Sequence, residues 1–204
     1  LQFGEGNFLR GFVDWMFDRL NKENDGDFGV VVVQPLPGGL ISKLNEQDGL
    51  YTLYLRGLLN GERTEETRIV DCITRGIDPY IDTEAFFECA NDPDLRYIVS
   101  NTTEAGIEYR KTEENFAETT YPGRLAMFMK KRFDAGLSGF LLLPCELIDK
   151  NGDCLKECVL KHAADWGYGE DFVRWVENEN SFANTLVDRI VTGYPRDNAS
   201  EMEK

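Results

Sequence analysis

The sequence predicts an α/β fold in which helices cover both faces of a doubly wound, mostly parallel sheet. Three observations lead to this prediction. Short apolar runs alternate along the chain with segments of helical periodicity. Residues 29–35 are a nearly continuous valine run, which is typical of a strand covered on both faces. A glycine-containing turn at residues 4–6 lies between the end of a strand and the start of a helix.

The first elements form one β-α-β unit. Residues 1–3 look like the end of a strand, and residues 7–20 follow as an amphipathic helix. The apolar residues that we expect along one face of this helix are Phe8, Phe12, Trp15, Met16 and Leu20. A turn at residues 24–27 then leads into the valine strand at 29–35.

The chain next makes an antiparallel excursion from the parallel pattern. Residues 51–59 and 67–74 are strand-like, and an Asn-Gly turn at residues 60–62 lies between them. A short helix follows, and Asp82 and Thr83 are of the residue types that cap a helix N-terminus.

The second half of the chain returns to alternating strands and helices. In chain order we expect a strand at 95–100, a helix at 121–133, a strand at 139–143, a helix from Asn151 or Asp153 to about Trp166, and a short helix around 172–176. Residues 184–192 are predicted to be either a strand or a crossing segment. Because no internal repeat or flexible linker separates two halves, we predict one domain over residues 1–204.

Charge and composition exclude several classes of protein. The formal net charge is −15, from 22 Lys and Arg against 37 Asp and Glu, so binding of nucleic acid through a general positive field is disfavoured. No stretch of 18 apolar residues occurs, which argues against a membrane span. The hydrophobic share of 42% is enough for a core, so wholesale disorder is excluded.

The cysteines and the chain ends give further expectations. Five cysteines without a secretory signal indicate reduced thiols and a cytoplasmic location. Cys154, Cys158 and His162 recur every four residues and could face a zinc ion, but a buried helix stripe is the favoured interpretation, and we predict no metal site. The apolar stub at residues 1–3 and the polar end at 198–204 predict a chain truncated at both ends.

The strongest chemical signal is the turn Gly4-Glu5-Gly6-Asn7-Phe8-Leu9-Arg10. At such a turn one glycine permits the reversal and the next lets the backbone approach a pyrophosphate, while the helix N-terminus supplies free N–H donors. Leu9 replaces the third glycine of the usual fingerprint, so the strand-turn-helix context carries the prediction of a nucleotide site.

The tip of the second strand bears on the choice of cofactor. It ends in Gln34-Pro35, without the carboxylate that usually binds the adenosine ribose of NAD. The Gln34 amide can still donate to and accept from a ribose. No Arg or Lys follows before Lys43, which disfavours a 2′-phosphate, so NAD is preferred to NADP.

Four separated motifs together resemble the polyol-specific long-chain dehydrogenases of the mannitol dehydrogenase family. They are Gly4-x-Gly6-x-Phe8-x-Arg10, residues 47–52 (QDGLYT), residues 103–106 (TEAG) and residues 184–190 (NTLVDRI). Within the family, residues 31–35, 142–148 and 191–197 look most like the enzymes that interconvert D-altronate and D-tagaturonate in hexuronate catabolism. The resemblance implies NAD as cofactor, a sugar acid as substrate and a Rossmann domain followed by a helical C-terminal domain.

The resemblance also implies roles for individual residues. It places Gly4, Gly6, Asn7, Phe8 and Arg10 around the pyrophosphate, Gln34 and Pro35 near the adenosine ribose, Thr103 and Glu104 on the nicotinamide side, and Asp188 and Arg189 at the substrate cleft. The family's catalytic lysine belongs to the helical domain, which is absent here, and none of the lysines from Lys43 to Lys161 matches its motif. No catalytic residue is therefore assigned to this chain, which we expect to be inactive alone.

One departure and several alternatives remain at this point. Mannitol dehydrogenases carry Cys-Asp-Asn where this chain has Cys145-Glu146-Leu147, so no substrate role is transferred to Leu147. Related enzymes acting on fructuronate, mannitol or mannitol 1-phosphate are alternatives within the family. Outside it, the alternatives are an adenosylmethionine-dependent methyltransferase and a nucleotide-binding module without chemistry of its own.

Overall fold

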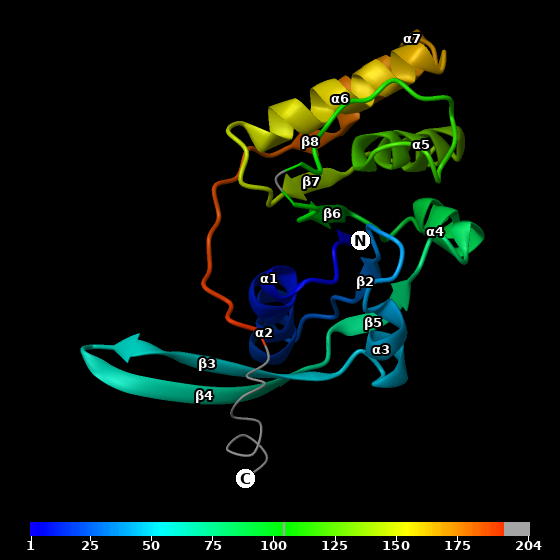
Figure 1. Ribbon diagram of the computed structural model, residues 1–204. Coiled ribbons are helices and arrows are strands. Elements are labelled where there is room, and N and C mark those ends of the chain that lie inside the picture. Colours follow the sequence, from blue (N-terminus) through cyan, green and yellow to red (C-terminus); the bar gives the residue numbers. More distant parts are fainter. Residues whose placement is uncertain (104, 194–204) are drawn as a thin grey trace.

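The computed structural model describes residues 1–103 and 105–193, and its centre is a six-stranded parallel sheet (Figure 1). Every pair of neighbouring strands in this sheet is parallel. In spatial order the strands are β5 (Ile73–Ile77), β2 (Val30–Val33), β1 (Gln2–Phe3), β6 (Tyr97–Ser100), β7 (Leu141–Pro144) and β8 (Ser181–Phe182). The doubly wound, mostly parallel Rossmann-type sheet predicted from the sequence is confirmed.

The strand order reverses at β1. From β1 the chain proceeds outward through β2 to β5 and then returns to the other side of β1 to form β6, β7 and β8. In the sheet, Phe3 pairs with Val33 on one side and with Ser100 on the other. Open α/β sheets bind ligands at such a switch point, outside the carboxyl ends of the strands. The crevice between the ends of β1 and β6 is therefore where a ligand site is expected.

Helices cover both faces of the sheet, as the continuous apolar strands require. They are α1 (Asn7–Leu9), the π-helical η1 (Arg10–Asp14), α2 (Trp15–Asn24), α3 (Ile41–Glu46), α4 (Thr83–Glu88), the 3₁₀ turn η2 (Cys89–Asn91), α5 (Tyr121–Asp134), α6 (Asn151–Asp165) and α7 (Glu170–Glu179). The larger core lies on the side of α4 to α7, around Phe86, Phe128 and Phe172. Smaller clusters on the other side join α3 and the helix at residues 7–24 to the sheet.

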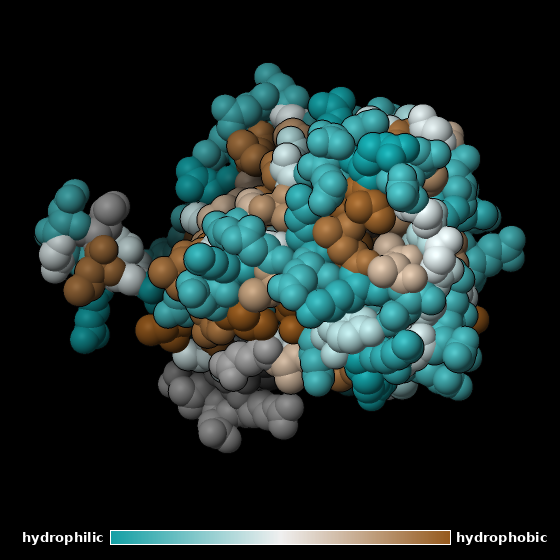
Figure 2. All heavy atoms as spheres, turned by 90° about the horizontal axis from the view of Figure 1, so that it is seen from above, coloured by the Kyte–Doolittle hydropathy of each residue, from teal (hydrophilic) through white to brown (hydrophobic). Residues whose placement is uncertain are grey.

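The antiparallel excursion forms a separate two-stranded sheet, β3 (Tyr51–Leu59) and β4 (Glu62–Val70). Asn60 and Gly61 both have positive φ, as a tight hairpin turn requires. The hairpin projects from the body, and its tip stands apart when the molecule is seen from above (Figures 1 and 2). The prediction of one strand at 67–74 is wrong, because the ladder of β4 ends at Val70 and the chain enters the main sheet as β5 at Ile73.

The first helix corrects two further expectations. Residues 7–24 form three consecutive helical segments, α1, η1 and α2, so the helix is longer than predicted and contains a π-helical turn. The predicted apolar stripe is not its buried face, because Met16 and Leu20 are exposed whereas Asp14 and Asp18 are buried. The hydrophobic pattern is misleading here because the two aspartates point inward to polar partners.

Most of the remaining elements follow the sequence closely. Asp82 caps α4 by accepting a hydrogen bond from the Ala85 N–H at 2.9 Å. Asn151, one of the two predicted starts, is the first residue of α6. Residues 184–192 contain no strand; they cross from the end of β8 to the helix at residues 7–24, so only the crossing alternative is correct (Figure 1).

The last features of the fold are its surface and α6, the helix that carries Cys154 and Cys158. Among the described residues no helix is long and apolar enough to cross a membrane. Figure 2 shows a largely hydrophilic face with scattered hydrophobic areas. His162 is fully buried in α6, with Nε2 3.2 Å from Thr120 Oγ1, and the described residues hold no metal-binding group that includes it.

Candidate functional site

The glycine turn follows β1 at the switch point of the sheet. The Gly4 N–H donates to the carbonyl of Val33 at 3.0 Å, and its φ of +122° is a conformation that favours glycine. A Cβ on Gly4 would stand 2.9 Å from the carbonyl oxygen of Asn101, so a larger residue does not fit between β1 and β6. At Gly6 a Cβ would meet nothing within 4 Å, because this residue faces open space.

The helix that begins after this turn leaves its first amides available to a ligand. Gly6 is extended at the N-cap of α1 and provides no side-chain cap. Its carbonyl accepts from the Arg10 N–H, so the N–H groups before Arg10 precede the first helical hydrogen bond. Free N–H groups and the positive end of the helix dipole favour an anion at this position. Asn7 is exposed and Phe8 is half-buried at the same end.

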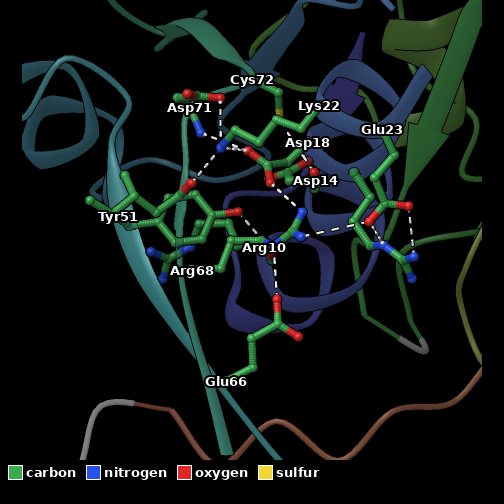
Figure 3. A network of polar contacts seen from close by, with 12 residues as sticks. Arg10, Asp14, Asp18, Lys22, Glu23, Tyr51, Glu66, Arg68, Asp71 and Cys72 are labelled. Carbon is green, nitrogen blue, oxygen red and sulfur yellow. Dashed lines mark hydrogen bonds and ion pairs between the residues drawn. The ribbon is translucent and has the colours of Figure 1, made fainter. Parts of the chain in front are cut away.

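Arg10 is held in place by Asn7 of its own helix and by Tyr51 of β3. Its guanidinium donates to Asn7 Oδ1 at 2.7 Å and lies over the ring of Tyr51, 5.4 Å from the centroid. The Tyr51 hydroxyl donates to the Arg10 carbonyl at 2.7 Å. Tyr51 belongs to the QDGLYT motif at the base of the hairpin, so this motif supports the glycine-turn motif directly (Figure 3).

At the tip of β2, the Gln34 side chain is engaged within the protein. It is 2% exposed, and its Nε2 donates to Asp78 Oδ2 at 3.0 Å while its Oε1 accepts from the Ile41 N–H at 3.4 Å. The carbonyl of the next residue, Pro35, accepts from Tyr80 and from Arg124. The structure places both predicted residues at the expected edge, but the Gln34 amide already has protein partners.

The loop after β6 is fixed by a buried carboxylate. Glu146, which is 2% exposed, accepts hydrogen bonds from Ser100 Oγ and from both the N–H and the hydroxyl of Thr102. Thr103 follows with a φ of +87°, a strained conformation for a β-branched residue. This places Thr103 at the switch point, whereas Glu104 lies outside the described residues.

The predicted substrate residues lie on the crossing segment, above the first helix. The Arg189 guanidinium is 4.4 Å from the centroid of the Trp15 ring, and among the described ion pairs none joins it to Asp188. Val191 lies within 3.4 Å of the position of a Cβ on Gly11. Residues 194–197 of the predicted family segment lie outside the described residues.

Two functional candidates were missed by the sequence analysis. Asp14 is fully buried directly behind the turn, and burial raises its pKa to about 7 against the opposing effects of Gln2 and Arg10. Glu146 was noted only as a departure from the family pattern, yet it organises the loop after β6. The sequence carried no signal for Asp14, because the apolar pattern predicts a different buried face for this helix.

Together these residues form an edge whose backbone amides and positive charge suit an anionic ligand. The edge offers a glycine without room for a side chain, a free helix N-terminus and one arginine whose position is set by neighbouring groups. The family of mannitol dehydrogenase Rossmann domains matches residues 1–203. The chain belongs to the mannitol dehydrogenase family.

Curated relatives agree with this membership. Altronate oxidoreductase of Bacillus subtilis strain 168 is 48% identical over 99% of the chain, and that of Escherichia coli O7:K1 is 44% identical over 100% of it. The chain spans 43% and 44% of those two proteins, which is less than half of their length. The family predicted from the four motifs is confirmed.

Two solved structures share the fold of this chain. Mannitol 2-dehydrogenase of Pseudomonas fluorescens, in a ternary complex with NAD and D-mannitol, matches 93% of the chain with a TM-score of 0.80 and 23% identity. A substrate-free D-sorbitol dehydrogenase matches 99% of the chain with a TM-score of 0.82 and 23% identity. The chain covers 41% and 44% of these proteins, respectively.

Proposed function

We propose that the chain is the cofactor-binding part of an NAD-dependent oxidoreductase that interconverts D-altronate and D-tagaturonate. The cofactor part rests on one observation, the glycine turn and free helix N-terminus at the switch point between β1 and β6. The sugar acid part is supported by relatives named altronate oxidoreductase, which are 44% to 48% identical over nearly the whole chain.

Different residues at the carboxyl ends of β1 and β6 bind different parts of the cofactor. The backbone from Gly4 to Asn7 and the helix N-terminus receive the diphosphate, and Arg10 adds a positive charge held by Asn7 and Tyr51. Glu146 fixes the loop that carries Thr103, on the nicotinamide side. Arg189 and Asp188 lie on the segment that crosses toward the same helix, as part of the proposed substrate region.

The chemistry requires more than this edge. NAD supplies or accepts a hydride when bound. Reduction of a ketone leaves negative charge on its oxygen, which needs a general acid and hydrogen-bond donors. We propose that a lysine outside residues 1–204 fills this role, in a helical domain that the longer relatives have room for.

The test is a titration of the purified chain with NADH and, separately, with NADPH. Energy transfer from tryptophan to bound nicotinamide reports binding, since Trp15 lies in the helix behind the turn. The melting temperature should rise with NADH, because a ligand that binds only the folded state stabilises it. Saturable binding of NADH supports the proposal. Absence of binding in the chain, with binding in the full-length Bacillus subtilis relative as a positive control, would contradict it.

A further inference from the structure

The usual ribose-binding carboxylate of NAD enzymes is missing from the tip of β2. Such enzymes place an Asp or Glu there, about 20 residues after the glycine turn, to accept hydrogen bonds from the ribose hydroxyls. Here that position holds Gln34, whose amide is buried against Asp78 and the N–H of Ile41. Because the Gln34 side chain is 2% exposed, it presents little surface to a ribose.

The carboxylate of Glu5 reaches the tip of β2 from the glycine turn. It is the residue between the two glycines of the turn, and its Oε1 accepts from the Leu40 N–H at 3.4 Å, beyond the tip of β2. Both Glu5 Oε1 and Gln34 Oε1 lie within 2.6 Å of the point where a Cβ on Gly39 would stand. The side chain is half-buried, and its Oε2 has no hydrogen-bond partner among the described residues.

Gly39 shows that the space for this carboxylate is built into the loop. A Cβ on Gly39 would stand 2.2 Å from Glu5 Oε1, a distance that no real contact allows. The φ of Gly39 is not positive, so its backbone does not itself require glycine. A side chain at this position would displace the Glu5 carboxylate or the Gln34 amide from its present place.

We propose that Glu5 is the specificity residue for the cofactor: its carboxylate accepts hydrogen bonds from the adenosine ribose hydroxyls and repels a 2′-phosphate. A carboxylate is an acceptor without donors, which suits a vicinal diol and opposes a phosphate. The position of Glu5 between the diphosphate turn and the tip of β2 is where an adenosine ribose bound across this edge would lie. This inference rests on the proposed NAD-binding function.

The experiment compares Glu5→Gln with the unchanged chain by fluorescence titration with NADH and with NADPH. Loss of a charged acceptor should weaken NADH binding by about tenfold, because a hydrogen bond to a charged group is worth more than a neutral one. NADPH binding should strengthen at the same time. The ratio of the NADPH Kd to the NADH Kd should therefore fall by more than the loss in NADH affinity alone. Melting temperatures without ligand check that the variant is folded.

A second variant and a matched control separate this inference from a general effect. Gly39→Ala keeps the Glu5 charge but displaces its carboxylate, and it should also reduce the NADH preference. Glu177→Gln removes the same charge from exposed α7 and should leave both affinities unchanged. If the unchanged chain prefers NADH but Glu5→Gln has the same preference, the role of Glu5 is excluded while the proposed function stands. If the unchanged chain binds neither cofactor, the proposed function itself fails.

Discussion

Asp14 is a fully buried carboxyl group on the helix behind the glycine turn. Its Oδ2 accepts from Gln2 Nε2 at 3.4 Å, and its Oδ1 has no hydrogen-bond partner among the described residues (Figure 3). Burial raises its pKa from 3.8 to about 7, although Gln2 and the charge of Arg10 oppose the change. The folded state therefore favours the neutral form of Asp14, which lies in the helix that carries the candidate diphosphate site.

The raised pKa of Asp14 predicts a specific dependence of stability on pH. Its neutral form contributes stability that is complete below the unfolded-state pKa of 3.8 and is lost as the pH rises through about 7. Asp14→Asn should therefore raise the free energy of unfolding at about pH 8, by an amount on the order of 2 to 4 kcal/mol, and leave it nearly unchanged at about pH 4. Urea unfolding at the two pH values measures this; equal effects at both would show that Asp14 is ionised in the folded state.

Residue roles at the site were only partly predictable from the sequence. The glycine turn and Arg10 could be predicted because their positions follow from local chain order. The engagement of Gln34 and the reach of Glu5 depend on the loop at residues 39–41, which meets them only in the folded chain. The inward direction of Asp14 depends on the contact of its side chain with Gln2 of β1, which periodicity does not encode.

At the scale of elements, the hairpin is attached to the body by a buried ion pair. The side chain of Asp18 on α2 has no exposure and accepts from Lys22 Nζ at 2.6 Å and from Arg68 on β4 at 3.0 Å (Figure 3). Burial opposes its ionisation, but the hydrogen bonds from Lys22 and Arg68 outweigh this effect and hold its pKa below the usual value. The N–H of Asp71, just after β4, donates to the same carboxylate.

Asp18→Asn should loosen the hairpin more than the sheet. The substitution removes the charge that accepts hydrogen bonds from both Lys22 and Arg68, so we expect a loss of about 2 kcal/mol in the free energy of unfolding. Hydrogen exchange should accelerate at residues 51–70 before it does in β1 and β6. Because the folded pKa is lowered, the difference from the unchanged chain should vanish as the pH falls through that pKa.

The control for the hairpin prediction is Glu157→Gln. Glu157 pairs with Lys161 on α6, away from the hairpin, and both side chains are at least half exposed. Exposed pairs contribute about 1 kcal/mol or less. Hairpin exchange as fast in this variant as in Asp18→Asn would show that the buried pair is not what attaches the hairpin.

Asn151 hydrogen-bonds to three parts of the chain near the end of β7. Its Nδ2 donates to the carbonyls of Pro144 and Glu146 and to Thr185 Oγ1, and its Oδ1 accepts from the N–H of Thr185. It therefore connects the end of β7, the start of α6 and the crossing segment. Each of these contacts requires the amide of this side chain in one orientation.

Asn151→Asp should release the crossing segment. A carboxylate oxygen in place of Nδ2 would face two carbonyl oxygens, at a cost of about 3 kcal/mol in the free energy of unfolding. Limited proteolysis should then cut within residues 183–193 faster than in the unchanged chain. Asn178→Asp is the matched control, because Asn178 is exposed and its Nδ2 donates only to the carbonyl of Arg174 among the described residues. Equal cutting in both variants would contradict the role of Asn151.

Element boundaries were harder to predict than element types. The sequence from residue 67 to residue 74 is continuously strand-like, yet β4 pairs with β3 and β5 pairs with β2. The division at Asp71 comes from the contact of its N–H with Asp18, which is 53 residues away in the chain. The π-helical turn of η1 likewise has no signal in an apolar pattern.

At the scale of the whole molecule, three of the four family motifs converge on one helix. The glycine turn begins the helix at residues 7–24, the QDGLYT motif reaches it through Tyr51, and the NTLVDRI motif crosses it with Arg189 over Trp15. These motifs are spread over nearly 190 residues of sequence. The strand order that brings them together follows from the alternation of elements, which is why the overall fold was predictable although many side-chain contacts were not.

We predict that the chain alone turns over slowly, because the general acid of the proposed mechanism lies outside residues 1–204. Lys22, Lys130 and Lys161 are each paired with an acidic residue four positions away on their own helix, so none of the three is a free general acid at the switch point. With D-altronate and NAD, the chain should form NADH at least about 100-fold more slowly than the full-length Bacillus subtilis relative, since general acid–base catalysis contributes at least this factor. The assay follows NADH absorbance at matched concentrations, with cofactor binding by the chain verified first. Turnover near that of the relative would show that residues 1–204 contain their own acid and base, and would place the catalytic centre on the edge formed by β1, β6 and β7 rather than outside this chain.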